Sequence, residues 1–322
     1  MKKHFSSFYK SGNIGLIFAS IILIVILSFT EGFLTPFNLF NLGRNLAIYS
    51  IIGLAQAMVL IIGDLNLSIG AIGGLSIVTV GYFLVELKTS SFVAVIAALF
   101  VGILCGLING VITAKGKINA FIVTLATLFI FNGIKLGVTK GFPYVGISES
   151  FKIMGQGEIF NIPYILIFMI VLLFIVFIFF NFNTYGRRLL AVGDNRDASI
   201  FVGLNIERHV ILAHVLSGFL AGLGGVLFVS RIGTAQPQSG ENWLLISFSV
   251  AIIGGTALSG GVITASGIFI GSLIMVVIKN ALIMLKINVY WESAVLGVII
   301  LLAVFIDQLR QYMNKKQIEV KT

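Results

Sequence analysis

Ten runs of mostly apolar residues follow one another along the chain, each of about 20 residues, the length that crosses a bilayer as one α-helix. None alternates polar and apolar residues as a membrane barrel strand does. With 58% hydrophobic and 10% charged residues, the composition exceeds what a soluble core uses. The sequence therefore predicts an all-α polytopic membrane protein with one transmembrane domain over residues 1–322, with spans near 14–30, 45–62, 69–85, 92–114, 118–137, 162–181, 208–230, 243–258, 265–285 and 289–307.

Lysine and arginine are distributed unevenly between the predicted loops. Positive charge favours the cytoplasmic side of a membrane. With a cytoplasmic N-terminus, ten spans return the C-terminus to the same side, where 13 of the 21 basic residues then lie. We expect a protein of the bacterial cytoplasmic (inner) membrane with both termini in the cytoplasm. Its net charge of +9 indicates topology and contact with anionic lipid, and gives no reason to expect a nucleic-acid partner.

The stretch Ile61 to Ser76 places Asp64, Asn66 and Ser68 between glycines at the edge of a predicted span. Irregular backbone at membrane depth is tolerated only where it is buried in protein or lines an aqueous cavity. The alternative interpretation is a short cytoplasmic loop whose polar residues cap helix ends. Residues 31–44 are predicted as the first connection, in which Pro36 stops a helix and an amphipathic turn lies along the outer interface.

Two pairs of segments resemble each other across the chain. Residues 252–263 align without gaps on residues 61–72, and residues 286–290 resemble residues 117–121. We interpret spans two to five as repeated in spans seven to ten. Because five spans separate the copies, the second is predicted to be upside down relative to the first, the plan of many transporters.

A pathway between two such repeats is expected to be lined by polar residues inside the spans. Uncharged amides and hydroxyls suit a neutral, hydroxylated solute, although the same groups also bond helices to one another. Lys135 and Lys279 lie near enough to predicted helix ends to snorkel or cap, and no chain of ionisable residues suggests a proton relay. The candidate pathway residues are Gln56, Asn66, Ser68, Asn109, Thr124, Thr127, Asn132 and Asn280, with Thr113 beside them.

Catalytic and metal-binding signatures are absent from the sequence. No phosphate-binding loop, serine hydrolase motif or zinc protease motif occurs, and the three histidines share no metal-ligand spacing. We therefore expect a transport subunit that is not an enzyme and that holds no metal or cofactor. The single cysteine, Cys105, lies in the small-residue series Gly102, Gly106 and Gly110 and is interpreted as a packing residue.

The longest polar interval, residues 183–209, separates the two halves and must face water. Its segment Gly186–Asn195, continuing to Ala198 and Gly203–Asn205, resembles the cytoplasmic loop of ribose-type (monosaccharide) ABC importer permeases. Three further blocks agree in the same order, within residues 63–70, 119–128 and 230–261. Together the blocks extend the resemblance over nearly the whole chain.

The resemblance implies the membrane-spanning subunit of a binding-protein-dependent importer. Such permeases form a homo- or heterodimer, bind two cytoplasmic ABC ATPase subunits and receive a sugar from an extracytoplasmic binding protein. A short helix within Ala191 to Val202 is then expected to sit in a cleft of the ATPase, with Gly193 and Gly203 at its ends, while two arginines of the loop are equally explained as positive-inside anchors. The coupling residues implied are Gly186, Arg187, Arg188, Ala191, Gly193, Asn195, Ala198, Gly203 and Asn205.

Other functions stay open from the sequence. The same architecture imports nucleosides, branched-chain amino acids and furanone-type signals in related systems. An ion-coupled secondary transporter is disfavoured by the lack of ionisable chains inside the spans, and a membrane scaffold without transport is disfavoured by the repeat.

Overall fold

The computed structural model describes residues 21–288 apart from residue 23, together with 291, 293–295, 297, 298, 301 and 305. Within this part, seven helices are long and apolar enough to cross a membrane, so the predicted all-α polytopic fold is confirmed. The predicted spans 14–30 and 289–307 lie partly outside the described residues. The seven are α3 (Pro36–Leu60), α4 (Ile69–Gly81) with the π-helical turn η1 (Tyr82–Glu86), α5 (Ser91–Gly116), α6 (Ala120–Thr139), α8 (Tyr164–Phe182), α11 (Ile206–Ile232) and α13 (Ala265–Met284).

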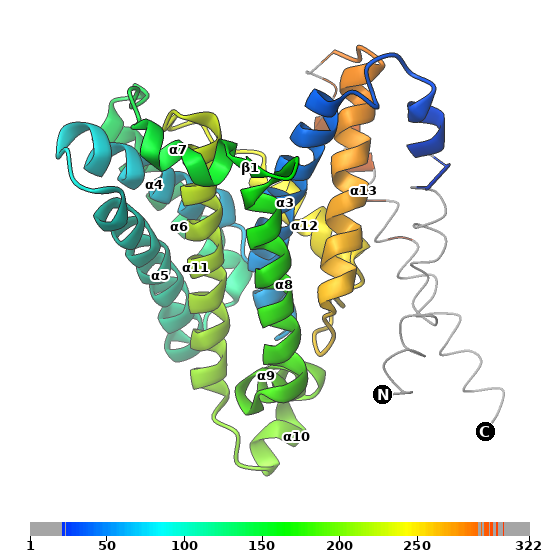
Figure 1. Ribbon diagram of the computed structural model, residues 1–322. Coiled ribbons are helices and arrows are strands. Elements are labelled where there is room, and N and C mark those ends of the chain that lie inside the picture. The colour runs from blue at the N-terminus through cyan, green and yellow to red at the C-terminus, as the bar shows by residue number, and fades with distance from the viewer. Residues whose placement is uncertain are drawn as a thin grey trace.

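Shorter elements mark the two ends of the bundle (Figure 1). Helix α7 (Glu149–Gln156) and a hairpin of β1 (Glu158–Ile159) and β2 (Ile162–Pro163) lie at one end. Helices α9 (Thr184–Asp194) and α10 (Arg196–Phe201) lie at the other. We refer to these as the α7 end and the α9 end. Helix α12 (Trp243–Ile253) is apolar but spans only 11 residues.

The prediction that Pro36 stops a helix is wrong, because Pro36 begins α3. The N–H of the first helical residue has no acceptor within the helix, so proline, which has no N–H, loses no hydrogen bond there. Its fixed φ also matches the helical value. Thr35 Oγ1 accepts a hydrogen bond from Asn38 N at 3.4 Å and caps the helix. Residues 36–44 are therefore helical and not part of an interfacial turn.

Two of the helices begin after irregular segments that pack against other helices. Residues 61–68 precede α4, and residues 233–242 precede α12. The second segment runs along α4, where a Cβ at Gly70 would overlap the Gly240 carbonyl and one at Gly74 would lie 3.1 Å from the Ser239 carbonyl. The predicted span 243–258 is therefore too long: helix α12 ends at Ile253, before Gly255, whose φ of +79° leaves the helical region.

The matching segments 61–72 and 252–263 are not inverted copies of each other. Each follows a helix that runs toward the α9 end, α3 in one case and α12 in the other (Figure 1). The two turns are in direct contact, since Gly261 N donates to Ile61 O at 2.8 Å. The sequence match therefore joins two turns of the same direction, and the interpretation of this pair as evidence for inversion is wrong.

Helices α3 and α11 form the centre of the bundle. Their most apolar windows are 78% and 72% buried, against 28% for α5, α6 and α8, so the latter three present apolar faces outward. Helix α5 crosses α11 at backbone contact, because a Cβ on Gly106 would overlap the His214 carbonyl and one on Gly218 the Gly102 carbonyl. Cys105 is buried at this crossing, which confirms its interpretation as a packing residue.

Candidate functional site

A cluster of buried amides and hydroxyls fixes the irregular segment 61–68 at the centre of the bundle. Asn66 Oδ1 accepts from Ser68 N at 3.0 Å and from Ser68 Oγ at 2.7 Å, and Asn66 Nδ2 donates to Ser217 Oγ at 3.0 Å. Asn109 Nδ2 donates to Ser68 Oγ at 2.8 Å. These four residues are fully buried. Away from water, irregular backbone needs such partners, so this cluster holds the start of α4 against α5 and α11.

The other predicted pathway residues are dispersed. Thr124 joins the cluster by donating to Leu65 O at 3.2 Å, and Thr127 donates to Thr124 O at 3.3 Å. Asn280 Nδ2 donates to Asn38 Oδ1 at 2.7 Å, far from the cluster. Gln56 is fully buried on α3 without a hydrogen-bond partner among the described residues, and Asn132 is half-buried on α6. None of the eight lines either of the two cavities below.

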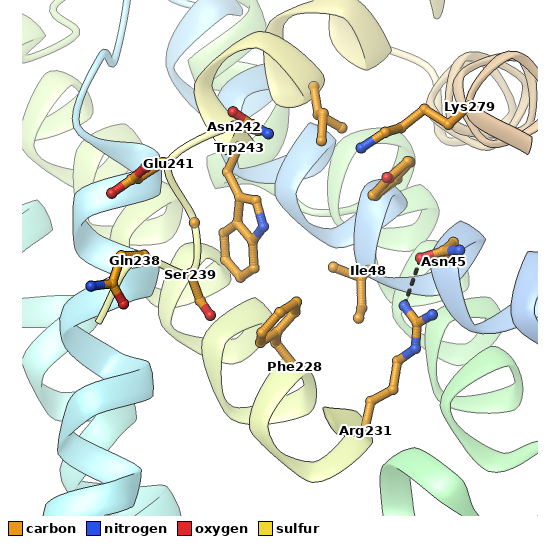
Figure 2. A pocket seen from close by; sticks show the side chains of 13 residues that line it. Asn45, Ile48, Phe228, Arg231, Gln238, Ser239, Glu241, Asn242, Trp243 and Lys279 are labelled. Carbon is orange, nitrogen blue, oxygen red and sulfur yellow. Dashed lines mark hydrogen bonds between the residues drawn. The ribbon is translucent and has the colours of Figure 1, made fainter. Parts of the chain in front are cut away.

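The first cavity, which we call the outer cavity, opens toward the α7 end and has a volume of about 280 Å³. Figure 2 shows Trp243 and Phe228 on one side of it and Arg231 with Asn45 on another, with Ile48 between them. The Trp243 and Phe228 rings meet edge to face with centroids 5.8 Å apart. The remaining lining residues are Tyr49, Gln238, Ser239, Gly240, Glu241, Asn242, Ile246 and Lys279.

The basic side chains in and beside the outer cavity interact with neighbouring side chains or backbone of its wall. Arg231 Nη1 donates to Asn45 Oδ1 at 2.6 Å, and Lys279 Nζ lies 5.4 Å from the centroid of the Tyr49 ring. Lys135 is 2% exposed, and the end of its side chain lies beside Gly74. The prediction that Lys135 snorkels or caps near a helix end is therefore wrong, because its side chain is buried inside the bundle.

Sequence reasoning did not find the outer cavity. The available signal was the polar run of residues 236–242, which interrupts two apolar runs and leads directly into Trp243. Aromatic side chains beside amides and a few charges are suited to a small polar molecule with an apolar ring face.

The second cavity, which we call the inner cavity, lies at the α9 end and has a volume of about 430 Å³. Asp64 Oδ1 pairs with Arg196 Nη2 at 2.8 Å, and Arg196 also donates to Ile62 O at 2.9 Å. Asp64 Oδ2 lies 3.9 Å from His214 Nε2. The lining residues are Asp64, Thr113, Ala114, Lys117, Ile118, Asn119, Ala120, Arg196, Ile206, Glu207 and Val210.

The interval 183–209 folds into α9 and α10 and docks against the bundle. A Cβ on Gly193 would overlap the Ile61 carbonyl and lie 2.7 Å from Gly261 N, so α9 touches both turns at this end. A Cβ on Gly186 would overlap the Phe179 carbonyl of α8. Helix α10 falls within the interval where a helix was predicted, but Gly193 lies inside α9 and not at the end of α10.

The remaining predicted coupling residues either lie at the ends of these helices or are exposed on their surface. Asn195 Oδ1 accepts from Ala198 N at 2.9 Å and caps α10, and Asn205 Oδ1 accepts from Arg208 N at 3.0 Å and caps α11. Gly203, with φ of +80°, ends α10. The predicted coupling residues whose side chains are exposed to solvent and cap no helix are Arg187, Arg188, Ala191 and Ala198.

The tip of this loop is apolar and exposed, which the sequence reasoning did not single out. Ile200 is 58% exposed, Phe201 91% and Val202 75%. Three adjacent, exposed apolar side chains at the end of a polar loop are a candidate surface for contact with another molecule. We call these three residues the apolar tip.

Comparison with known proteins places the chain among permeases. A family model described as "Branched-chain amino acid transport system / permease component" matches residues 38–304. The chain is 34% identical over 290 residues to the ribose import permease protein of Bacillus subtilis, covering 89% of this chain and 90% of the relative. It is 32% identical over 299 residues to the L-arabinose ABC transporter permease protein of Azospirillum brasilense, covering 92% and 88%. No solved structure was found to match.

Proposed function

The chain belongs to the family of branched-chain amino acid transport system permease components, and from that premise we propose that it carries a monosaccharide into the cytoplasm as the membrane subunit of an ATP-binding-cassette importer. The observation that carries the substrate class is the nearly full-length similarity to import permeases for ribose and L-arabinose. The outer cavity supports it. Trp243, Tyr49 and Phe228 offer ring faces beside amide and charged groups, a combination that suits a sugar ring with its hydroxyls.

Two partners follow from the two ends of the bundle. We infer that the α9 end faces the cytoplasm, where a separate ABC ATPase subunit binds the apolar tip, since the chain has no nucleotide site of its own. The α7 end then faces outward and receives the solute from an extracytoplasmic binding protein above the outer cavity. A second permease subunit completes the transporter in the membrane.

We also infer an inverted repeat that relates α3, α4 and α5 to α11, α12 and α13. Members of each pair run in opposite directions between the two ends (Figure 1). Their packing is equivalent, because α11 contacts α4 and α5 as α3 contacts α12 and α13. Both short helices, α4 and α12, follow irregular segments. Discontinuous helices in corresponding positions of two halves are typical of transporters that bind their solute near the membrane centre.

The proposed function is tested by uptake in vesicles that contain the permease, its ATPase and its binding protein. We expect ATP-dependent accumulation of D-ribose or L-arabinose and none of leucine. Accumulation of leucine without either sugar would move the protein to the amino-acid branch of its family. Sugar uptake driven by an ion gradient without ATP would contradict an ATP-binding-cassette mechanism.

Replacing Phe201 with aspartate is expected to release the ATPase. The side chain is 91% exposed and adds little to the fold, so the variant protein should be present in the membrane at its normal level. A charge placed at a desolvated contact weakens the affinity for the partner several-fold or more. Co-purification of the ATPase with the permease measures the effect. Phe160→Asp is the matched control, because Phe160 is equally exposed but lies at the α7 end. Equal ATPase retention by both variants would refute the assignment of the apolar tip.

A further inference from the structure

We propose that the inner cavity is a binding site for the transported solute on its way to the cytoplasm, and that Asp64, Thr113 and Asn119 bind a neutral molecule rich in hydroxyls there. This inference rests on the proposed function and adds to it a second site at the end opposite the outer cavity. It also assigns to Asp64 a role in binding the solute, in addition to its ion pair with Arg196.

Unsatisfied polar atoms lie in the wall of this cavity. Thr113 is 9% exposed, and its Oγ1 has no hydrogen-bond partner among the described residues. Asp64 Oδ2 also accepts no hydrogen bond among the described residues, since Oδ1 is the atom bound to Arg196 and His214 Nε2 lies 3.9 Å from Oδ2. Leaving such a buried atom unpaired costs about 1–3 kcal/mol. Both atoms are covered beneath the cavity surface, so a small turn of either side chain would let a solute hydroxyl donate to the carboxylate or exchange a hydrogen bond with Thr113 and remove these costs.

Asn119 completes the polar side of the cavity. Its Oδ1 accepts from Phe121 N at 2.8 Å and caps α6, and the residue lines the same cavity, so its amide nitrogen is available as a donor there. The site thus offers an anionic acceptor, a hydroxyl and an amide donor. Ile118, Ala120 and Val210 supply the apolar remainder. This mixture matches a molecule that carries hydroxyls on a carbon ring.

The charges of the inner cavity favour a neutral ligand. Asp64 and Glu207 are balanced by Lys117 and Arg196, and Asp64 and Arg196 neutralise each other at 2.8 Å. The lining therefore carries two formal negative and two formal positive charges, and no net charge to attract an ion. The volume of about 430 Å³ lies within the roughly 300–1,000 Å³ of small-molecule pockets.

The position of the cavity connects it to the transport route. Thr113 lies one helical turn from Asn109, whose side chain bonds Ser68 in the central polar cluster, so polar groups continue from the cluster to the cavity. Arg196 is the first residue of α10. A movement of α10 driven by an ATPase would therefore displace a wall of the cavity directly.

Labelling of a cysteine in the cavity tests this proposal. In full transporters carrying Cys105→Ala, Ala114→Cys places a thiol in the lining, and Lys115→Cys places one on the next residue, which is exposed and outside the cavity. Inside-out vesicles present the α9 end to a membrane-impermeant thiol reagent. We expect D-ribose or L-arabinose to slow labelling of Ala114→Cys several-fold and to leave Lys115→Cys unchanged. Adding Thr113→Val should remove the protection, whereas Thr79→Val, the same change outside the cavity, should not.

Several outcomes would overturn the site, and they are separable from failure of the proposed function. A sugar that is imported but leaves the labelling of Ala114→Cys unchanged shows that the cavity does not bind the solute. Protection by leucine and not by sugars contradicts a neutral, hydroxylated ligand. Protection that persists in the Phe201→Asp variant supports the site even without transport, because binding in the cavity needs no ATPase.

Discussion

Replacing Gly193 with alanine is expected to abolish import while leaving the ATPase bound. A Cβ at this position would overlap the Ile61 carbonyl and lie 2.7 Å from Gly261 N, and all of these neighbours are backbone atoms that no rotamer change can move. Ile61 O is itself held by Gly261 N at 2.8 Å. Helix α9 would have to move away from both turns. It would then no longer contact the segments that lead into α4 and α13.

The size of this effect follows from overpacking. Forcing an extra carbon into a closely packed contact costs about 1–3 kcal/mol, and about 3 kcal/mol corresponds to a change of about 100-fold in the population of the docked state. The apolar tip lies on α10 and the residue after it, and is unchanged, so the ATPase should still co-purify and hydrolyse ATP. The expected phenotype is therefore uncoupling: hydrolysis without sugar uptake in reconstituted vesicles.

Gly137→Ala is the matched control for Gly193→Ala. Gly137 is also helical, on α6, and nothing lies within 4 Å of the Cβ that alanine would add. Alanine in a helix is favoured over glycine by about 0.5–1 kcal/mol, so this variant should transport normally. Normal sugar uptake by Gly193→Ala would show that the contact of α9 with the two turns does not transmit movement from the ATPase to the membrane helices.

Replacing Gly218 with leucine is expected to prevent the protein from folding. Gly218 lies where α11 crosses α5, and even a single Cβ there would overlap the Gly102 carbonyl and lie 2.9 Å from Gly106. A leucine would hold the two backbones several ångströms apart. Because α11 also carries Ser217, which bonds Asn66, the separation would open the central polar cluster as well.

This substitution belongs to the rare class that costs more than about 4 kcal/mol, since it combines overpacking with unpaired buried polar groups. We expect little folded protein in the membrane and, for what is recovered, a thermal midpoint far below that of the unmodified permease. Gly133→Leu is the control, because Gly133 of α6 is exposed and has nothing within 4 Å of its added Cβ. Equal thermal midpoints for the two variants would show that the α5–α11 crossing is not required.

The fate of individual residues shows where prediction from the sequence succeeds. The burial of Asn66, Ser68 and Asn109 inside the bundle follows from their being amides and hydroxyls in apolar runs, and their bonds to one another match the alternative that such groups join helices, while their predicted role in a solute pathway stays a prediction. The packing role of Cys105 follows from the glycines at four-residue spacing around it. Gln56 and Asn280 share the same local features but lie elsewhere, because a local pattern does not say which helix faces which.

The sequence by itself determined the class of the protein, its polytopic helical fold and the resemblance of its loop to that of importer permeases. Hydrophobic length and charge are properties of single segments, and a bilayer converts them directly into helices and loops. Only the tertiary structure decided that Pro36 opens a helix and that α12 is short. It also joined Asp64 to Arg196, far along the chain, and assembled the outer cavity from four elements and the loop before α12. Those features depend on contacts between segments that are distant in the sequence. The free energy of such contacts cannot be inferred from the residues of one segment alone.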